Sequence, residues 1–381
     1  MAHTLITLPA FPLPMNQEQR GNFLRNIITS VRTQDYPYDQ RAPKKVDWHA
    51  YDVAQAHEIA DILEIIRVSV DIAHRRLQAR RKPKVRRGPP GVPVDEVVKV
   101  LLFQTYLGVS NRVAEGLTEI LWMPLGLSQP FSYKTIERGY DRHRVDELLE
   151  EVLVLTNLPV KDLEKAFSVD GSGSPTRKKE NYADIRERQR KNKEEGRKGA
   201  DRFPTGHHDF VYSVFMVGAT FKLISAWRNT ATHEEGETSF FPGLLAETKA
   251  RHPGMEMVLG DGAYAGRPQC DTAKALGVVP RFLPRRNATF KRYGSAGWVD
   301  MLWALVRGPQ EWLSEYYQRE ASENANSVIK NDYPNPLRKR REGRRCTEDR
   351  LRGLCYNLKR LCYLHRLVGL SVKPVLLAAA Q

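Results

Sequence analysis

The alternation of strand-like and helix-like segments after Lys165 constrains the fold more than any other feature of the sequence. The segments AFSVDGSG and FVYSVFMVGATFKLISAWRN predict three consecutive strands, of which the last two are joined by a turn at VGA. MEMVLGDGAYAG and LGVVPRFLPRR predict two more strands, and helical patterns such as FFPGLLAETKAR and RPQCDTAKAL separate these later strands. This order predicts an α/β fold in which a mixed five-stranded sheet is flanked by helices.

A helical region precedes this core. Apolar residues recur at helical spacing after Asp52 and again from Val94 onward. In the second stretch Gly108 can end one helix, and Ser110 and Ser132 can cap the two that follow. Short helices joined by turns that contain Gly or Pro are typical of helix-turn-helix-like bundles that bind DNA. Other small helical domains have the same pattern, so both interpretations stay open.

Shifts in composition divide the chain into four parts. Residues 1–50 are rich in proline and predict an irregular arm. The other three parts are a helical, helix-turn-helix-like region at 51–160 with a basic linker at 75–93, an α/β core at 161–335 with a basic insertion at 174–208, and a C-terminal basic helix within 336–381 that packs on the core.

The charge of the chain predicts a polyanionic partner. The net charge is +15, and eight Lys or Arg residues lie between positions 75 and 87. Nucleic acid is the commonest polyanion for a protein with such a field. The basic insertion is either a solvated loop or a segment that follows a phosphate backbone, and the two interpretations are compatible. Apolar runs are too short to span a bilayer and prolines interrupt the N-terminus, so we expect no membrane association and a cytoplasmic, nucleoid-associated location.

Two aspartates occupy matching positions in the predicted sheet. Asp170 and Asp261 each end an apolar strand, and each is followed at once by glycine. A single Asp-Gly after a strand is more often a turn. If the two strands are neighbours, however, the two carboxylates lie side by side and repel each other unless a cation lies between them. Oxygen ligands without His or Cys nearby are suited to Mg²⁺ or Mn²⁺.

The segment EYYQREASENANSVIK predicts a helix with an unusual stripe of side chains. At about 100° per residue, Tyr316, Arg319, Glu323 and Lys330 fall within roughly 60° of one another. A solvated helix face with an Arg319–Glu323 ion pair would explain part of this pattern. It explains neither the tyrosine nor the position of the stripe after two strand-terminal aspartates. Glu320 is a competing acid nearer the edge of the stripe.

The spacing Tyr-x2-Arg-x3-Glu-x6-Lys matches without a gap the Y-R-E-K signature of a group of insertion-sequence transposases. These enzymes have a DDE active site on a ribonuclease-H-like fold, and the resemblance extends over roughly residues 90 to 365. The order of the motifs is also similar, with Asp170 in SVDGSG and Asp261 in LGDGAYAG, where Tyr264 follows closely. The sequence departs from the pattern in its long basic insertion. Only 61 residues separate Asp261 from Glu323, which leaves no room for the β-rich insertion of some relatives.

The resemblance implies a site and its chemistry. Asp170 would bridge two Mg²⁺ or Mn²⁺ ions, and Asp261 and Glu323 would each hold one. Cleavage at the transposon ends would free 3′-hydroxyls that then attack target DNA. Lys330 would contact a phosphate, and Arg319 would bind a phosphate or orient Glu323. Tyr316 would stack on a displaced base or hydrogen-bond the backbone.

The same resemblance implies that the partner is double-stranded DNA, both transposon ends and target, bound by a homodimer. Two alternatives remain at this point. One is a transposase-derived DNA-binding protein without catalysis, against which the presence of all three carboxylates argues. The other is a metal-dependent DNA nuclease on the same fold, which the sequence separates poorly from a transposase because hydrolysis and strand transfer use the same ions and acids.

Overall fold

The computed structural model describes residues 16–33, 46–81, 91–141, 143–179, 208–231 and 236–379, together with Arg190 and Glu194. The strands are β1 (Ala166–Lys179), β2 (His208–Gly218), β3 (Ile224–Thr230), β4 (Met257–Gly260) and β5 (Val279–Phe282). The helices before the sheet are α1 (Gln17–Arg32), α2 (Trp48–Ala79), α3 (Val94–Leu107), α4 (Asn111–Leu125), α5 (Tyr133–Gly139), α6 (His143–Asn157) and the short η1 (Leu158–Val160). The later helices are α8 (Glu237–Arg251), α9 (Arg267–Ala275), α10 (Ala296–Arg307), α11 (Pro309–Tyr316), η2 (Tyr317–Arg319), α12 (Glu320–Asp332), α13 (Glu342–Val368) and α14 (Val372–Ala378).

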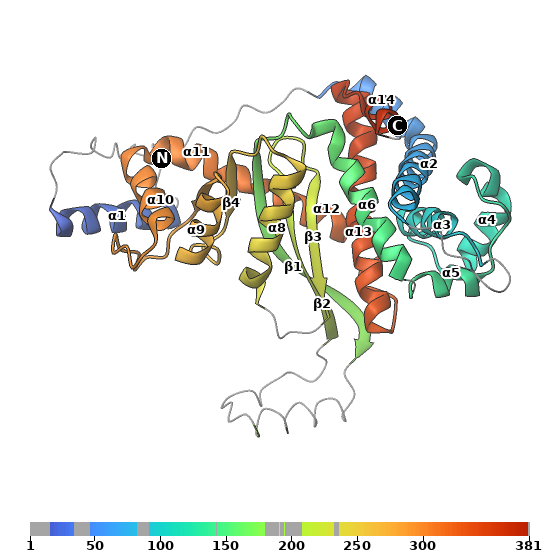
Figure 1. The fold of residues 1–381 in the computed structure, drawn as a ribbon, viewed down its shortest axis with the longest axis horizontal. Coiled ribbons are helices and arrows are strands. Elements are labelled where there is room, and N and C mark those ends of the chain that lie inside the picture. Colours follow the sequence, from blue (N-terminus) through green and yellow to red (C-terminus); the bar gives the residue numbers. More distant parts are fainter. Residues whose placement is uncertain are drawn as a thin grey trace, which may run out of the picture.

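The described strands form one mixed sheet in the order β3-β2-β1-β4-β5. The pairs β1–β2 and β2–β3 are antiparallel, and the pairs β1–β4 and β4–β5 are parallel. Figure 1 shows this sheet at the centre of the molecule, with α8 on one face and α12 and α13 on the other. The predicted α/β fold, a mixed five-stranded sheet flanked by helices with an N-terminal helical region, is confirmed and is consistent with a ribonuclease-H-like fold.

The alternation of side chains along β2 builds two apolar cores, one on each face of the sheet. Val214 and Met216 join the cluster that includes α1, α8, α9, α10 and α11. Phe215 and Val217 join the cluster that includes α2, α3, α6, α12 and α13. Along β1 the same rule directs Phe167 and Val169 to the first core. Their neighbours in the strand therefore face α12, which is where the candidate site lies.

Helix α13 fastens three strands and the N-terminal helices together. It packs on α2, α3 and α6 as well as on β3. The carboxylate of Asp349 accepts hydrogen bonds from Ser174 (2.8 Å), Ser213 and the amide of Asn229 (3.1 Å), one from each of β1, β2 and β3. The guanidinium of Arg352 donates to Ser174 at 3.0 Å. The C-terminal basic helix was thus rightly expected to pack on the core, and it joins the core to the helical region.

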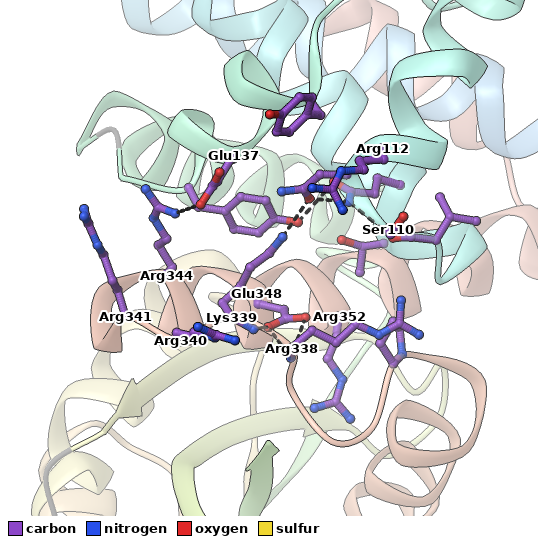
Figure 2. Close-up of a pocket in the computed structure, with 17 residues that line it drawn as sticks. Ser110, Arg112, Glu137, Arg338, Lys339, Arg340, Arg341, Arg344, Glu348 and Arg352 are labelled. Carbon is purple, nitrogen blue, oxygen red and sulfur yellow. Dashed lines mark hydrogen bonds and ion pairs between the residues drawn. The ribbon is translucent and has the colours of Figure 1, made fainter. Parts of the chain in front are cut away.

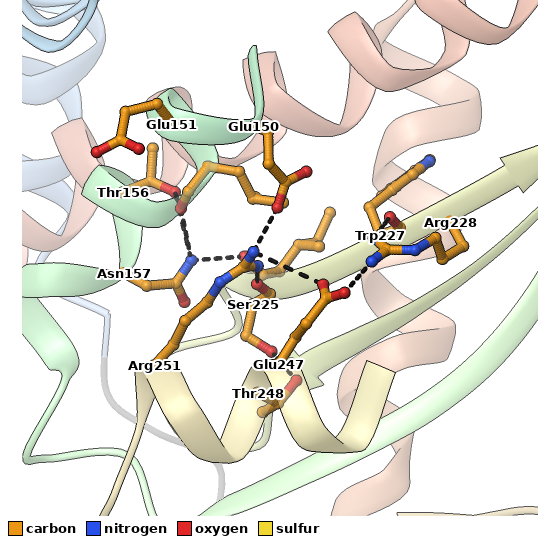
Figure 3. A network of polar contacts seen from close by, with 12 residues as sticks. Glu150, Glu151, Thr156, Asn157, Ser225, Trp227, Arg228, Glu247, Thr248 and Arg251 are labelled. Atoms are coloured by element: carbon orange, nitrogen blue, oxygen red, sulfur yellow. Dashed lines mark hydrogen bonds and ion pairs between the residues drawn. The ribbon is translucent and has the colours of Figure 1, made fainter. Parts of the chain in front are cut away.

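A polar network beside β3 makes a second connection to the helical region (Figure 3). The guanidinium of Arg251, at the end of α8, donates to the carboxylate of Glu150 on α6 and to the backbone carbonyl of Ser225 on β3. Glu247 lies 3.7 Å from Arg251 and also accepts from Arg228. These contacts connect the charged groups of α8 with α6 and β3, so polar as well as apolar contacts join the helical region to the sheet.

The N-terminal arm was predicted to be irregular, and this prediction is wrong for its middle part. Residues 17–32 form α1, which begins with a capping box between Asn16 and Gln19. Leu24, Ile27 and Ile28 are fully buried in the core that contains α10. Their partners in α10 lie about 270 to 280 positions later in the sequence. The proline-rich composition of the arm therefore could not predict that this helix is buried.

Other predicted boundaries also shift. The basic linker at 75–93 begins inside α2, which runs to Ala79, and its middle lies outside the described residues. Ser132 caps a helix as predicted, but that helix ends at Gly139 and α6 starts separately. Most of the insertion at 174–208 lies outside the described residues, whereas its first six residues extend β1. None of the described helices combines the length and apolar character needed to cross a membrane.

Replacing Asn357 by alanine should lower the free energy of unfolding by about 2–3 kcal/mol. This buried amide accepts from the backbone N–H of Ile224 at 2.8 Å and donates to its carbonyl at 2.8 Å and to Thr156 at 3.0 Å. Its loss leaves the buried N–H of Ile224 without this partner, whereas the carbonyl of Ile224 keeps its hydrogen bond from Asn157. Urea unfolding measures the change. Val368→Ala, at an exposed position of the same helix, should change it by less than about 0.5 kcal/mol, and equal effects would contradict the assignment.

Candidate active site

Asp170 and Asp261 lie at the same level of two adjacent parallel strands. In the register of β1 and β4, Ala166 pairs with Met257 and Ser168 with Leu259, a constant offset of 91 residues. Continued by two residues, the same offset sets Asp170 beside Asp261. Neighbouring strands are about 4.8 Å apart, so the two Cα atoms lie roughly 5 Å apart if the register continues. The two strands are neighbours, which was the condition for a shared carboxylate site in the sequence analysis.

The surroundings of the two aspartates differ. Asp261 follows the last residue of β4, is exposed, and accepts a hydrogen bond from the N–H of Ala263 at 2.7 Å. Asp170, which was expected to end its strand, lies inside β1, because the strand continues in its pairing with β2 as far as Lys179. The carboxylate of Asp170 is therefore held by a continuous strand and is the more buried of the two.

The pKa of Asp170 is raised to about 6, mainly because the carboxyl is buried and in part because the negative charges of Glu237 and Asp261 lie nearby. Hydrogen bonds from the N–H of Gly171 at 2.9 Å and the amide of Asn326 at 2.7 Å act in the opposite direction. Asp170, Glu237 and Asp261 therefore repel one another, and among the described residues no Lys or Arg forms an ion pair with Asp170. Such a region favours a proton or a metal cation.

Helix α12 is fixed to β1 by a pair of serines on the face of the strand that carries Asp170. The hydroxyls of Ser168 and Ser322 are hydrogen-bonded to each other at 2.6 Å, and both lie within hydrogen-bond distance of the backbone carbonyl of Arg319, at 3.0 and 2.9 Å respectively. Asn326 lies one helical turn further and reaches Asp170. Glu323 follows Ser322 directly, so the beginning of α12 and the two aspartates meet at one edge of the sheet.

The signature residues do not lie on one continuous α-helix, contrary to the stripe predicted from a constant 100° per residue. Tyr316 ends α11, Arg319 ends the 3-10 turn η2, and Glu323 lies in the first turn of α12. The guanidinium of Arg319 lies 5.4 Å above the ring of Tyr316 and forms an ion pair with Glu323. The tighter turn keeps these three side chains together although the helix is interrupted.

Tyr316 is part of the core. Its ring is 4% exposed and stacks on Trp312 with 5.2 Å between the ring centroids. The predicted stacking of this ring on a displaced base therefore conflicts with its packing in this structure. Lys330, in the last turn of α12, is half-buried, and the described part of the chain shows no carboxylate within ion-pair distance of it. Glu320 is exposed at the start of α12.

Glu237 is an acid that the fold brings to the site and that was not predicted from the sequence. Glu237 is the first residue of α8, and its carboxylate accepts a hydrogen bond from the hydroxyl of Tyr264 at 2.6 Å. Burial and the charge of Glu237 raise the pKa of Tyr264 and of Tyr212, so both phenols stay protonated. The acid follows no strand-like motif and lies 67 residues from Asp170. Of the residues that contact Glu237, only Tyr264 was noted in the sequence analysis, as part of the DGAYAG motif.

The donor set fits Mg²⁺ or Mn²⁺ in its chemistry, because the nearby acids are carboxylates. A divalent cation bound here would relieve the repulsion among Asp170, Glu237 and Asp261. In the conformation described here, however, the described residues contain no group of three His, Cys, Asp or Glu side chains close enough to hold a metal ion. Glu323 is turned to Arg319 instead.

No protein-family model matches the chain. A protein from Archaeoglobus fulgidus described as a probable transposase for insertion sequence element ISA1214 is 24% identical to it over 338 residues. The alignment covers 85% of this chain and 91% of that protein. The similarity therefore extends over the helical region and the sheet, and is not confined to one motif.

Gly171→Ala should destabilise the protein by about 1–3 kcal/mol, whereas Gly262→Ala should change the stability little. These are the two glycines that follow the aspartates. A Cβ at position 171 would overlap the hydroxyl of Tyr212 and lie 2.7 Å from the carboxylate of Glu237, whereas at position 262 the nearest atom is 3.4 Å away. Urea unfolding of both variants measures the difference. Equal stabilities would contradict the close packing of Glu237 over β1.

Proposed function

We propose that this chain is an insertion-sequence transposase that cleaves DNA at the ends of its element and joins them to target DNA. One observation carries the proposal. The register of the parallel strands β1 and β4, continued by two residues, sets Asp170 beside Asp261, and the chain aligns over 85% of its length with a probable transposase. The segment with the Y-R-E-K spacing contacts β1 beside Asp170, and the net charge of +15 suits a nucleic-acid substrate.

Asp170, Asp261 and Glu323 are the proposed ligands of two Mg²⁺ or Mn²⁺ ions. When bound, such ions act as Lewis acids that activate a water molecule and stabilise the departing 3′ oxygen. The protein orients the carboxylates. Asn326 and the backbone of Gly171 hold Asp170, and the N–H of Ala263 holds Asp261.

Arg319 has two proposed tasks. It neutralises Glu323 while the site is empty of substrate, and it binds a phosphate once Glu323 turns toward the aspartates. Glu323 is about half exposed, so this change is a side-chain rotation. Lys330 is the second proposed phosphate contact. Double-stranded DNA, as transposon ends and target, is the proposed partner, bound by a homodimer that holds the paired ends.

Asp170→Asn, Asp261→Asn and Glu323→Gln should each lower DNA cleavage by about 100-fold or more, the scale on which losing one stabilising group acts. Glu320→Gln is the matched control, since this exposed acid shares α12 with Glu323. The assay incubates purified protein and Mg²⁺ or Mn²⁺ with DNA from the flanks of its own gene, and gels resolve cleaved and joined products.

Full cleavage by any of the three variants would contradict the site. Cleavage without joining by the unaltered protein would indicate a nuclease. DNA binding without cleavage would indicate a DNA-binding protein without catalysis.

Divalent cations should stabilise the unaltered protein against heat through Asp170 and Asp261. A cation at a hundred times its Kd adds about 2.7 kcal/mol of stability. Thermal unfolding with increasing Mn²⁺, without DNA, measures this effect. The Asp170→Asn/Asp261→Asn double variant should lose the rise in Tm, and Glu320→Gln should keep it. An equal rise in the double variant would show that the cation binds elsewhere.

A further inference from the structure

A cleft of about 480 Å³ lies between the N-terminal helices and the segment that leads into α13. One wall is formed by the beginning of α4 together with α5, and the other by residues 338–341. Helix α13 forms the floor. Figure 2 shows arginine and lysine side chains from both walls around this space. The cleft is separate from the aspartates. One of its walls belongs to the helical region for which DNA binding was one of two interpretations of the sequence, but the cleft and its second wall were not predicted.

The lining of the cleft is strongly basic. Seven Lys or Arg residues and two glutamates line it. Both glutamates are already engaged. Glu137 forms an ion pair with Arg344, and Glu348 accepts hydrogen bonds from the backbone N–H groups of Arg338 and Lys339 at 2.9–3.1 Å. The remaining cations therefore give the cleft a net positive potential.

The backbone that carries these cations is fixed. Glu348 is 5% exposed and anchors two successive peptide groups from below. Just before them, the N–H of Leu337 donates to the carbonyl of Pro175 at 2.8 Å, and Leu337 forms a bridge with Thr176 of β1. A segment tied at both points loses little conformational freedom when a ligand binds, which favours binding.

Three arginines have exposed side chains that a ligand can reach. Arg340 is exposed, and the described residues include no carboxylate within ion-pair distance of it. Arg341 is 74% exposed, and its contact with Asp141 is long, at 3.7 Å. On the opposite wall, the exposed Arg112 lies over the ring of Tyr133 at 5.4 Å.

We propose that this cleft binds the phosphate backbone of duplex DNA. Arg340 and Arg341 contact phosphates from one wall of the cleft, and Arg112 contacts phosphates from the opposite wall. Guanidinium groups match phosphate oxygens in geometry and charge, and exposed cations on opposing walls suit a polyanion that lies along an open cleft. The identification of the polyanion as DNA rests on the proposed function. The cleft itself rests on the contacts given above.

The position of the cleft lets one duplex reach it and the candidate active site. Thr176, which carries the bridge to Leu337, lies six residues beyond Asp170 on the same strand. At about 3.3 Å per residue this is roughly 20 Å along β1. A straight duplex covers that distance in about six base pairs. A probe of 30 base pairs therefore spans both.

The test measures the salt dependence of DNA binding by fluorescence anisotropy with a labelled 30-base-pair duplex. All proteins carry Asp170→Asn so that the probe stays intact. The variants are Arg340→Gln/Arg341→Gln and Arg112→Gln. The matched control, Lys161→Gln/Lys165→Gln, removes two charges from exposed positions near the start of β1, at its opposite end. Each phosphate contact contributes about 0.9 to the slope of log K against log salt.

The double variant should lower that slope by about 1.8 and Arg112→Gln by about 0.9, with the control unchanged. Between 50 and 200 mM salt the parent protein should then lose about tenfold more affinity than the double variant. If the parent binds duplex DNA but the cleft variants have the same slope as the parent or the control, DNA binding by the cleft is overturned. The proposed function then remains intact. No duplex binding by the parent would overturn both. Tighter binding of a duplex RNA of the same length would overturn DNA as the ligand.

Discussion

The parallel pairing of β1 with β4 is the constraint on which the candidate site depends. Its constant register brings Asp170 and Asp261 to one level, although 90 residues separate them in the sequence. Without this pairing, Asp170 would be an isolated acid within a strand and Asp261 an isolated acid in a turn. The pairing is possible because β4 adds to β1 on the side opposite β2, so that the long antiparallel β1–β2 pair supports the site from one flank. Helix α12 then closes it through Ser168 and Ser322.

Local chemistry explains what the sequence could predict. The succession of strands and helices along the chain, the helix end at Gly108 and the caps at Ser110 and Ser132 depend on neighbouring residues, and the structure has each of them. Long-range packing explains the rest. The burial of α1 depends on α10, and the position of Glu237 depends on where α8 lies on the sheet. Neither partner is visible within a sequence window.

The signature segment shows both sides of this limit. Its spacing suggested a stripe of four side chains, and Arg319, Tyr316 and Glu323 do lie together. The 3-10 turn and the burial of the Tyr316 ring were not visible in the spacing, because Trp312 stacks on that ring from the preceding helix. In this conformation Arg319 holds Glu323. To join the two aspartates in the proposed site, the third carboxylate would have to leave Arg319.

The most direct test of this account is a crystal structure of the protein with Mn²⁺ and a duplex, read by anomalous scattering of the metal. We predict a peak between the carboxylates of Asp170 and Asp261, with metal–oxygen distances of about 2.1 Å. Glu323 should have turned away from Arg319 and toward the metal. A peak remote from both aspartates, with Glu323 still paired to Arg319, would contradict the proposed site.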